Sequence, residues 1–399
     1  AAPAGRDRRG RAANHGRAGT DVPGGERLTK APFWTVAELV AQTAAPSGFQ
    51  VSLEDIVPGV GTLVLGRLSR YSADGTPFER GDVLFGKLRP YLAKYWLADR
   101  EGVAGGDIHV YRPRKGVDPR YLAYIVGSRD FMRYAVAASK GVKMPRVEWM
   151  SLRQYGVNWY DEDTQRRVAD YLDRETGEID AMLAKLDELR EQLIQRRLAA
   201  VDNEFSCVGT SSKARLPFVA DVIPGLTYSP SDIVDSGGVV VHRAGSVQNS
   251  RIDRSDLVRV STSIPAKLCI QPGDILVCTR NGSAHLVGKC AIVGISEIGE
   301  TWGAFMTVLR SQHYRYIYWY MQSSLFAQER KQYFTSTINQ LTVGMFSRMM
   351  IPFPESHVQE RIADHLDEVT GRIDAMLATI DELKALLVER RAALITDVV

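Results

Sequence analysis

A long internal repeat constrains this 399-residue chain more than any other feature. The segment from Gln165 to Val201 returns from Gln359 to Ile395, with 21 identities in 37 positions at a fixed offset of 194. Because a domain-sized stretch separates the copies, the chain has duplicated a large unit and is not a solenoid of short repeats. The sequence therefore predicts the order domain, helix, domain, helix.

Each copy has the apolar spacing of a coiled-coil helix. The steps of 3, 4, 3 and 4 residues join Ile179, Met182, Leu186, Leu189 and Leu193, and again Ile373, Met376, Ile380, Leu383 and Leu387. This a/d spacing predicts that the two copies pair with each other, the alternative being that each helix packs on its own domain. Glycine is costly inside a helix, so at Gly177 and Gly371 we expect a joint. A short helix (about 162–173) would precede it, and a long helix (about 178–201) would follow.

The remaining blocks predict an α+β fold with two globular domains. Gly81-Asp-Val-Leu-Phe and Gly273-Asp-Ile-Leu-Val each read as a turn followed by a buried strand. Further strands are expected at 108–111, 239–242, 291–294 and 306–309, and helices at 121–126 and 316–326. The expected domains are a flexible Ala/Gly/Arg-rich tail (1–29), a first domain (30–160), a helical region (161–204), a second domain (205–354) and a second helical region (355–399). The tail is either disordered until a partner orders it or a basic DNA-contacting arm.

The net charge of +3 alternates along the chain. It is +4, +5, −4, +3 and −5 over residues 1–30, 31–160, 161–201, 202–354 and 355–399. The basic domains suit a polyanion, whereas the acidic helices suit a protein partner. Each long helix carries a pair of arginines near its expected end, Arg196 with Arg197 and Arg390 with Arg391. We expect their charges to stabilise the helix C-termini, the alternative being that they bind DNA.

Motifs for catalysis are missing from the sequence. It contains no methyltransferase Asn/Asp-Pro-Pro-Phe/Tyr motif, no GxGxxG after a strand, no phosphate-binding loop and no HExxH. Cys207, Cys269, Cys278 and Cys290 lack CxxC spacing, so we expect buried thiols and no disulfide or zinc site. With no run of about 18 apolar residues and no secretion signal, the expected protein is soluble and cytoplasmic. We expect a non-catalytic reader that binds no metal or cofactor itself.

The candidate DNA-binding residues follow strands or lie in basic loops. They are Lys87, Arg89, Tyr91, Lys140, Lys143 and Arg146 in the first domain, and Arg280, Asn281, Ser283, Asn339 and Gln340 in the second. Cations bind phosphates, Arg can bind guanine, and Asn or Gln can bind adenine through two hydrogen bonds. The alternative is that Arg89-Pro90 and Asn281-Gly282 are ordinary turns.

The first turns of the repeated helices carry identical polar residues outside the apolar seam. They are Gln165, Arg167 and Asp170 in one copy and Gln359, Arg361 and Asp364 in the other. Packing within a coiled coil does not require them. We therefore expect these six side chains to face or support a protein partner.

The domain order and several motifs resemble the specificity subunit of Type I restriction-modification systems, the HsdS family. The motifs are Gly81-Asp-Val-Leu-Phe-Gly-Lys-Leu-Arg-Pro-Tyr91, Gly141-Val-Lys-Met-Pro-Arg146, Gly273-Asp-Ile-Leu-Val-Cys-Thr-Arg-Asn-Gly-Ser283 and the helix starts at Gln165 and Gln359. The stretch from Ser336 to Leu341 departs from the usual Thr-Gly-x-x-x-Pro-x-Leu pattern.

The resemblance implies two target-recognition domains that each read half of a split DNA site. It also implies an antiparallel coiled coil with internal pseudo-twofold symmetry that spaces the domains and docks two modification subunits. Those subunits would bind S-adenosylmethionine and methylate adenine, and restriction subunits using ATP and Mg would complete a phage-defence enzyme. The alternative function is a tandem coiled-coil scaffold that binds only protein and does not read DNA.

Overall fold

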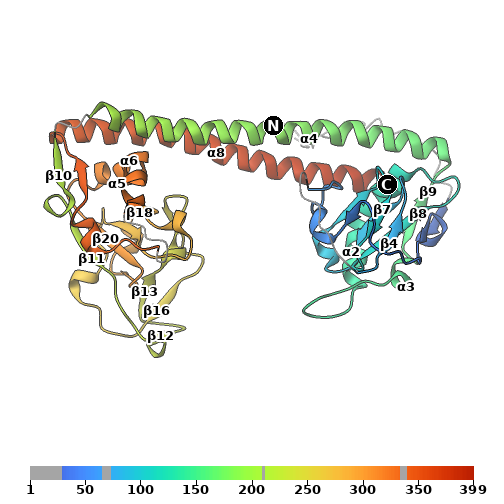
Figure 1. Ribbon diagram of the computed structural model, residues 1–399, viewed down its shortest axis with the longest axis horizontal. Helices are drawn as coiled ribbons and strands as arrows, with labels where there is room; N and C mark the ends of the chain where they lie inside the picture. The colour runs from blue at the N-terminus through green and yellow to red at the C-terminus, as the bar shows by residue number, and fades with distance from the viewer. Residues whose placement is uncertain (1–28, 65–72, 209–211, 333–338) are drawn as a thin grey trace, which may run out of the picture. The chain divides into compact units, whose positions relative to one another are not determined.

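The computed structural model describes residues 29–64, 73–208, 212–332 and 339–399, and the chain divides into two compact units. Unit 1 comprises Ala1–Lys185 and Leu383–Val399, and unit 2 comprises Leu186–Glu382. Each unit contains one α+β domain and parts of two long helices, α4 (Glu162–Cys207) and α8 (Ser356–Val398) (Figure 1). The predicted α+β class is confirmed, whereas the tail expected at 1–29 lies outside the described residues apart from its last residue.

Unit 1 is built on a four-stranded antiparallel sheet of order β2-β8-β5-β6. A three-stranded sheet (β3-β7-β4) and a pair (β1-β9) accompany it. The strands are β1 (Thr29–Pro32), β2 (Ala37–Leu39), β3 (Gln50–Val51), β4 (Thr76–Phe78), β5 (Val83–Gly86), β6 (Tyr95–Leu97), β7 (Gly102–Ala104), β8 (Ile108–Pro113) and β9 (Gly156–Trp159). The helices are α1 (Pro119–Gly127), α2 (Arg129–Ala137) and α3 (Trp149–Leu152). Their buried side chains join the start of α4 and the end of α8 in one core.

Unit 2 repeats this plan, with a sheet of order β11-β20-β17-β18, a second four-stranded sheet (β12-β16-β13-β19) and the pairs β10-β21 and β14-β15. The strands are β10 (Lys213–Arg215), β11 (Asp221–Pro224), β12 (Ile233–Val234), β13 (Val239–His242), β14 (Val247–Gln248), β15 (Arg251–Ile252), β16 (Val258–Val260), β17 (Ile275–Cys278), β18 (Cys290–Ile292), β19 (Thr301–Trp302), β20 (Met306–Arg310) and β21 (Met350–Pro352). The helices are α5 (Tyr314–Gln322), α6 (Ser324–Lys331) and α7 (Val343–Phe346).

In each unit, the aspartate of the repeated Gly-Asp turn links the two central strands of the sheet. The buried carboxylate of Asp82 accepts two hydrogen bonds from Arg112 at 3.0 and 2.8 Å, and that of Asp274 accepts two from Arg310 at 2.7 and 2.8 Å. A buried carboxylate needs such a partner, and the bidentate arginine fork provides it. The motif found in the sequence is therefore a structural tie in each domain.

The predicted helix at 316–326 is two helices. Ser323 has an extended backbone, and its hydroxyl accepts a hydrogen bond from the Phe326 amide, so it ends α5 and caps α6. Ser128 divides α1 from α2 in the same way. Serine favours such caps because its hydroxyl competes for backbone groups, which an apolar pattern does not reveal.

The expected joint at Gly177 and Gly371 is absent, because both long helices run through these positions without a break. The buried Thr176 hydroxyl donates to the Leu172 carbonyl oxygen at 2.6 Å within the same helix. The apolar side chains on either side, Leu172 and Ile179, are buried. Burying such side chains contributes about 1.5–3 kcal/mol each, which exceeds the cost of about 1 kcal/mol for glycine.

The two long helices pair antiparallel, as predicted. In unit 1 the Arg391 guanidinium lies 2.9 Å from the Asp180 carboxylate, and in unit 2 Arg197 lies 3.0 Å from Asp374. These are the same two positions of the repeat with the copies exchanged. The late arginines Arg197 and Arg391 therefore link the helices, and the expectation that they serve the helix C-termini is wrong for this pair because α4 continues to Cys207.

Only one row of the predicted seam is buried. In unit 2, Leu193, Ile373 and Ile380 form a buried cluster. The row three residues after each buried position is exposed, at 48% for Met182, 44% for Leu189, 53% for Met376 and 39% for Leu383. The predicted pairing of the two copies is confirmed, but only one of the two apolar rows is covered, because periodicity identifies apolar rows and not which of them a second helix covers.

Burial of all four cysteines was also expected, and it is found for Cys278 and Cys290 only. Cys207 is exposed at the end of α4, and Cys269 is half-buried.

We expect Gly177→Ala and Gly371→Ala each to raise the free energy of unfolding by about 0.5–1 kcal/mol. Both glycines are helical, and no atom lies within 4 Å of the position that a Cβ would take. Urea unfolding followed by circular dichroism measures the change. Gly61→Ala is the opposite control, since its Cβ would lie 2.9 Å from the Tyr95 ring. A lower midpoint for either helical variant would indicate that the helices need a bend there.

Candidate nucleic-acid interface and helix junctions

In unit 1, the loop after β5 lies against the segment between α2 and α3. The Val147 amide donates to the Lys87 carbonyl oxygen at 3.0 Å, and the Arg89 amide donates to that of Pro145 at 2.7 Å. Within the second segment, Lys140 and Arg146 form a two-way backbone bridge of 2.8 and 2.9 Å. The structure thus brings the two basic clusters of the first domain, 87–91 and 140–146, to one surface.

The loop after β5 has an unusual backbone. Arg89 and Ala93 have φ values of 51° and 50°, a left-handed conformation that is uncommon for residues other than glycine. The Arg89 bond to Pro145 and a 2.9 Å bond from the Leu92 amide to the Arg89 carbonyl oxygen hold it. The side chains of Arg89 and Tyr91 are exposed. Strained backbone that its surroundings hold in place is typical of functional sites.

Positive charge on this surface comes from lysine and arginine, not from histidine. His109 is buried with its Nδ1 3.0 Å from the Tyr111 hydroxyl. Burial, and to a lesser degree the charge of Lys87, lowers the pKa of His109 to about 3. The imidazole is therefore neutral near pH 7. Lys140 and Lys143 are exposed, and neither forms an ion pair within the described ranges, whereas Arg146 pairs with Asp107.

Unit 2 builds the same arrangement from different residues. The Leu341 amide donates to the Thr279 carbonyl oxygen at 2.8 Å, and Arg280 bridges Gln340. Leu341 and Gln340 stand 194 positions after Val147 and Arg146, so the strand-end loop meets the later segment in the same register in both units. The departure noted at Ser336–Leu341 does not alter this pairing, although residues 336–338 of it lie outside the described residues.

The five candidates of unit 2 differ in what their side chains can offer. The Asn281 carboxamide oxygen accepts from the Ser283 amide at 3.0 Å, and the Asn339 amide donates to the Gly282 carbonyl oxygen at 3.1 Å. Both side chains support the loop, as the ordinary-turn alternative expected for Asn281. Arg280 lies over the Phe305 ring at 5.0 Å. Phe305 is 54% exposed and was not identified from the sequence, since no pattern marks it.

The start of α4 is fixed to its own domain through Gln165, which is completely buried. Its side-chain amide donates to the carbonyl oxygens of Tyr160 at 2.8 Å and Gly116 at 3.2 Å, and its oxygen accepts from the Asp118 amide at 3.0 Å. Gln359 is also buried and donates to the Pro354 carbonyl oxygen at 2.6 Å. Of the two expected roles, burial excludes that these two side chains face a partner, and that they support one stays a prediction.

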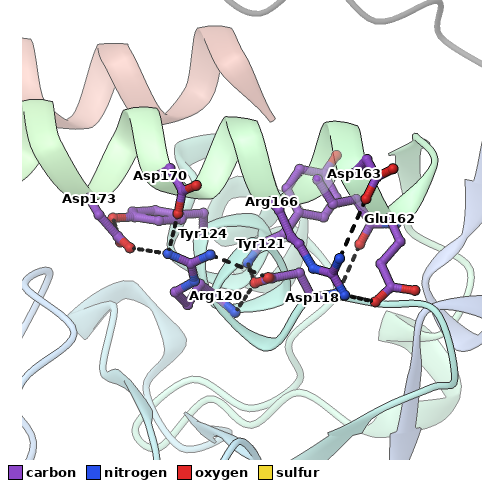
Figure 2. Close-up of polar contacts among 10 residues, drawn as sticks. Asp118, Arg120, Tyr121, Tyr124, Glu162, Asp163, Arg166, Asp170 and Asp173 are labelled. Carbon is purple, nitrogen blue, oxygen red and sulfur yellow. Dashed lines mark hydrogen bonds and ion pairs between the residues drawn. The ribbon is translucent and has the colours of Figure 1, made fainter.

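In each unit, one arginine of the domain forms ion pairs with two aspartates near the start of a long helix, α4 in unit 1 and α8 in unit 2. Arg120 reaches Asp170 at 2.6 Å and Asp173 at 2.8 Å, and the Tyr124 hydroxyl donates to Asp173 (Figure 2). The equivalent contacts in unit 2 join Arg315 to Asp364 at 2.8 Å and to Asp367, whose other oxygen accepts from the Trp319 indole.

Asp170 and Asp364 thus hold helix to domain, and the expectation that they face or support a partner stays a prediction. Arg167 and Arg361 remain exposed. The Arg167 guanidinium donates to the Thr164 hydroxyl at 2.8 Å.

Parts of the chain are similar to known proteins. Residues 214–385 match the family model described as Type I restriction modification DNA specificity domain. The StySPI specificity subunit of Salmonella potsdam is 26% identical over 189 residues, which cover 45% of this chain and 41% of that protein. The EcoKI specificity subunit of Escherichia coli K12 is 27% identical over 185 residues, covering 44% and 40%. Over these stretches the chain is similar to Type I restriction-modification specificity subunits. The matches span about two fifths of the length of these curated relatives.

Two solved structures share the fold of this chain. A chain from a study of complex assembly and conformational transition of the type I R-M system has a TM-score of 0.74 at 18% identity, covering 93% of this chain and 97% of that one. The HsdS subunit from Thermoanaerobacter tengcongensis has a TM-score of 0.52 at 17% identity, with 93% and 96% covered.

Two searches of the described part of the chain gave negative results. Every helix there is too short or too polar to cross a membrane. No three His, Cys, Asp or Glu side chains in these residues gather where they could hold a metal ion.

We expect the stability of the chain to fall as the pH decreases from 7 to 5, in part because of His109. Its pKa is about 3 when folded, whereas an unfolded histidine titrates near 6.5. The unfolded state therefore binds the proton first, and the linked loss is about 2 kcal/mol. His109→Gln should remove that component, as measured by urea unfolding at both pH values. Replacing the exposed His357 is the control. Equal pH dependence in wild type and His109→Gln would contradict the assignment.

Proposed function

We propose that this chain is the non-catalytic specificity subunit of a cytoplasmic Type I restriction-modification enzyme. Each unit reads one half of a bipartite duplex target, and the helices hold two modification subunits. The modification subunits supply S-adenosylmethionine and methylate adenine, and restriction subunits supply ATP-driven, Mg-dependent cleavage. The observation that carries this proposal is the same two-segment polar surface in both units.

The chemistry of the two surfaces supports DNA reading with different sequence preferences. Unit 1 presents Arg89, Lys140 and Lys143, which suit phosphates and guanine. Unit 2 presents Arg280 beside Gln340, and a glutamine can bind adenine through two hydrogen bonds. Because the backbone register is shared while the side chains differ, the two units are suited to two different half-sites.

The exposed apolar rows of the helices support docking of two equal partners. Met182 and Met376 occupy the same position of the repeat, as do Leu189 and Leu383. Apolar side chains that are uncovered in the free chain, and that recur in both copies, favour two equivalent protein contacts. Arg167 and Arg361, exposed at the helix starts, extend each contact with a charge.

The test of the function is methylation mapping in cells that carry this chain and its modification subunit. We expect methylated adenines in a motif of two specific parts separated by unread base pairs. Exchanging residues 280–283, the loop that follows β17, for another loop should change one part and leave the other part intact. A continuous motif would contradict the bipartite reading, and no methylation with a soluble complex would favour the protein-binding scaffold instead.

We expect Met182→Glu with Met376→Glu to reduce co-purification of the modification subunit at least tenfold, because desolvating a carboxylate costs several kcal/mol. The free chain should stay folded, since both side chains are about half exposed. Leu198→Glu, at an exposed position of α4 whose repeat equivalent is Ala392, is the matched control. If the variant still co-purifies fully with the modification subunit at low protein concentration, the row of Met182 and Met376 is not part of the docking contact.

A further inference from the structure

The tip of the segment between α2 and α3 exposes apolar side chains, which reading bases by hydrogen bonds does not require. Val142 is fully exposed and Met144 is 53% exposed, and neither belongs to a core cluster of unit 1. In Figure 1 the segment extends away from the sheets of its unit as a loop between α2 and α3. These two apolar side chains therefore add little to folding.

The tip is held in a defined conformation. The backbone bridge between Lys140 and Arg146 closes it, and the Arg89 bond to Pro145 anchors it to the loop after β5. Gly141 turns the chain at φ +101°, where a Cβ would lie 3.3 Å from the Met144 carbonyl oxygen. A tip that is already ordered loses less conformational entropy when it binds.

Positive side chains surround the apolar tip. Lys140, Lys143 and Arg146 lie within the same seven residues, and the ammonium groups of the two lysines are not engaged in ion pairs in the part of the chain that the structure describes. This combination fits a polyanion with an apolar interior, which is what duplex DNA offers between its phosphates and its stacked bases. An acidic protein surface would use the cations but leave Val142 uncovered.

We propose that Val142 and Met144 form an apolar wedge that enters the base stack of the half-site read by unit 1 and partly unstacks one step. The proposal rests on the function proposed above. Proteins that insert Met, Leu, Ile, Phe or Pro in this way kink the duplex, and the flanking cations hold the displaced phosphates.

The wedge adds selectivity without a base-specific hydrogen bond. Unstacking costs a few kcal/mol, and the cost is lowest at pyrimidine–purine steps such as TA and CA. The half-site of unit 1 should therefore contain such a step where the wedge enters.

The experiment uses the complex of the full chain with its modification subunit, on a duplex carrying the mapped motif. 2-Aminopurine is placed at successive positions of each half-site, away from the methylated adenine. We expect the complex to raise its fluorescence at one step. Val142→Ser with Met144→Ser should abolish this increase and weaken binding about tenfold, with an unchanged slope of log K against log salt. Val142→Leu with Met144→Leu should keep the increase.

Two controls separate the wedge from its surroundings. Lys140→Ala with Lys143→Ala should flatten the salt slope but retain the fluorescence increase. Met150→Ser, at an exposed methionine of α3, should change neither. Motif-specific binding without a fluorescence increase, or an increase that survives the serine substitutions, would overturn the wedge and leave the proposed function standing. Absence of motif-specific binding by the wild-type complex would overturn the proposed function and the wedge with it.

Discussion

In each unit, an arginine that pairs with two carboxylates connects the domain to its long helix. Arg120 spans Asp170 and Asp173, one helical turn apart, and Arg315 does the same in unit 2. Helix residues three apart lie on one face, so a single guanidinium can reach both carboxylates. Together with the buried Gln165, these ion pairs fix the direction in which α4 leaves its domain. The antiparallel pairing of the helices then begins from a defined position in each unit.

Outside the long helices, the two units resemble each other more in their contacts than in their sequences. The sheet order, the carboxylate–arginine tie and the meeting of the strand-end loop with the later segment recur in both units. The side chains displayed on those loops do not recur. Backbone hydrogen bonds explain the difference, because they set the register without depending on side-chain identity. A surface of this kind can change what it binds and keep its shape.

Sequence reasoning predicted the repeat, the α+β class and the pairing of the two helices, because periodicity and self-similarity report directly on packing. The antiparallel direction was implied by the family resemblance. It was wrong about the joint at Gly177, since a propensity of about 1 kcal/mol is overridden by tertiary contacts. It assigned Gln165 to a partner because a polar residue outside a seam looks exposed, whereas a buried hydrogen-bond network holds it. The meeting of Arg280 with Gln340 joins segments 60 residues apart, and no local pattern predicts such a contact.

The exposed apolar row of the long helices also affects how stable the free chain is against aggregation and degradation. A newly made copy that no other protein covers displays Met182, Leu189, Met376 and Leu383 to the solvent. Uncovered apolar rows on helices promote self-association and attract chaperones and proteases. Uncovered copies would thus be removed, which ties the amount of this chain to the supply of any protein that covers the row. Under the function proposed above, a cell would then hold few free copies competing with the complete enzyme for the same DNA sites.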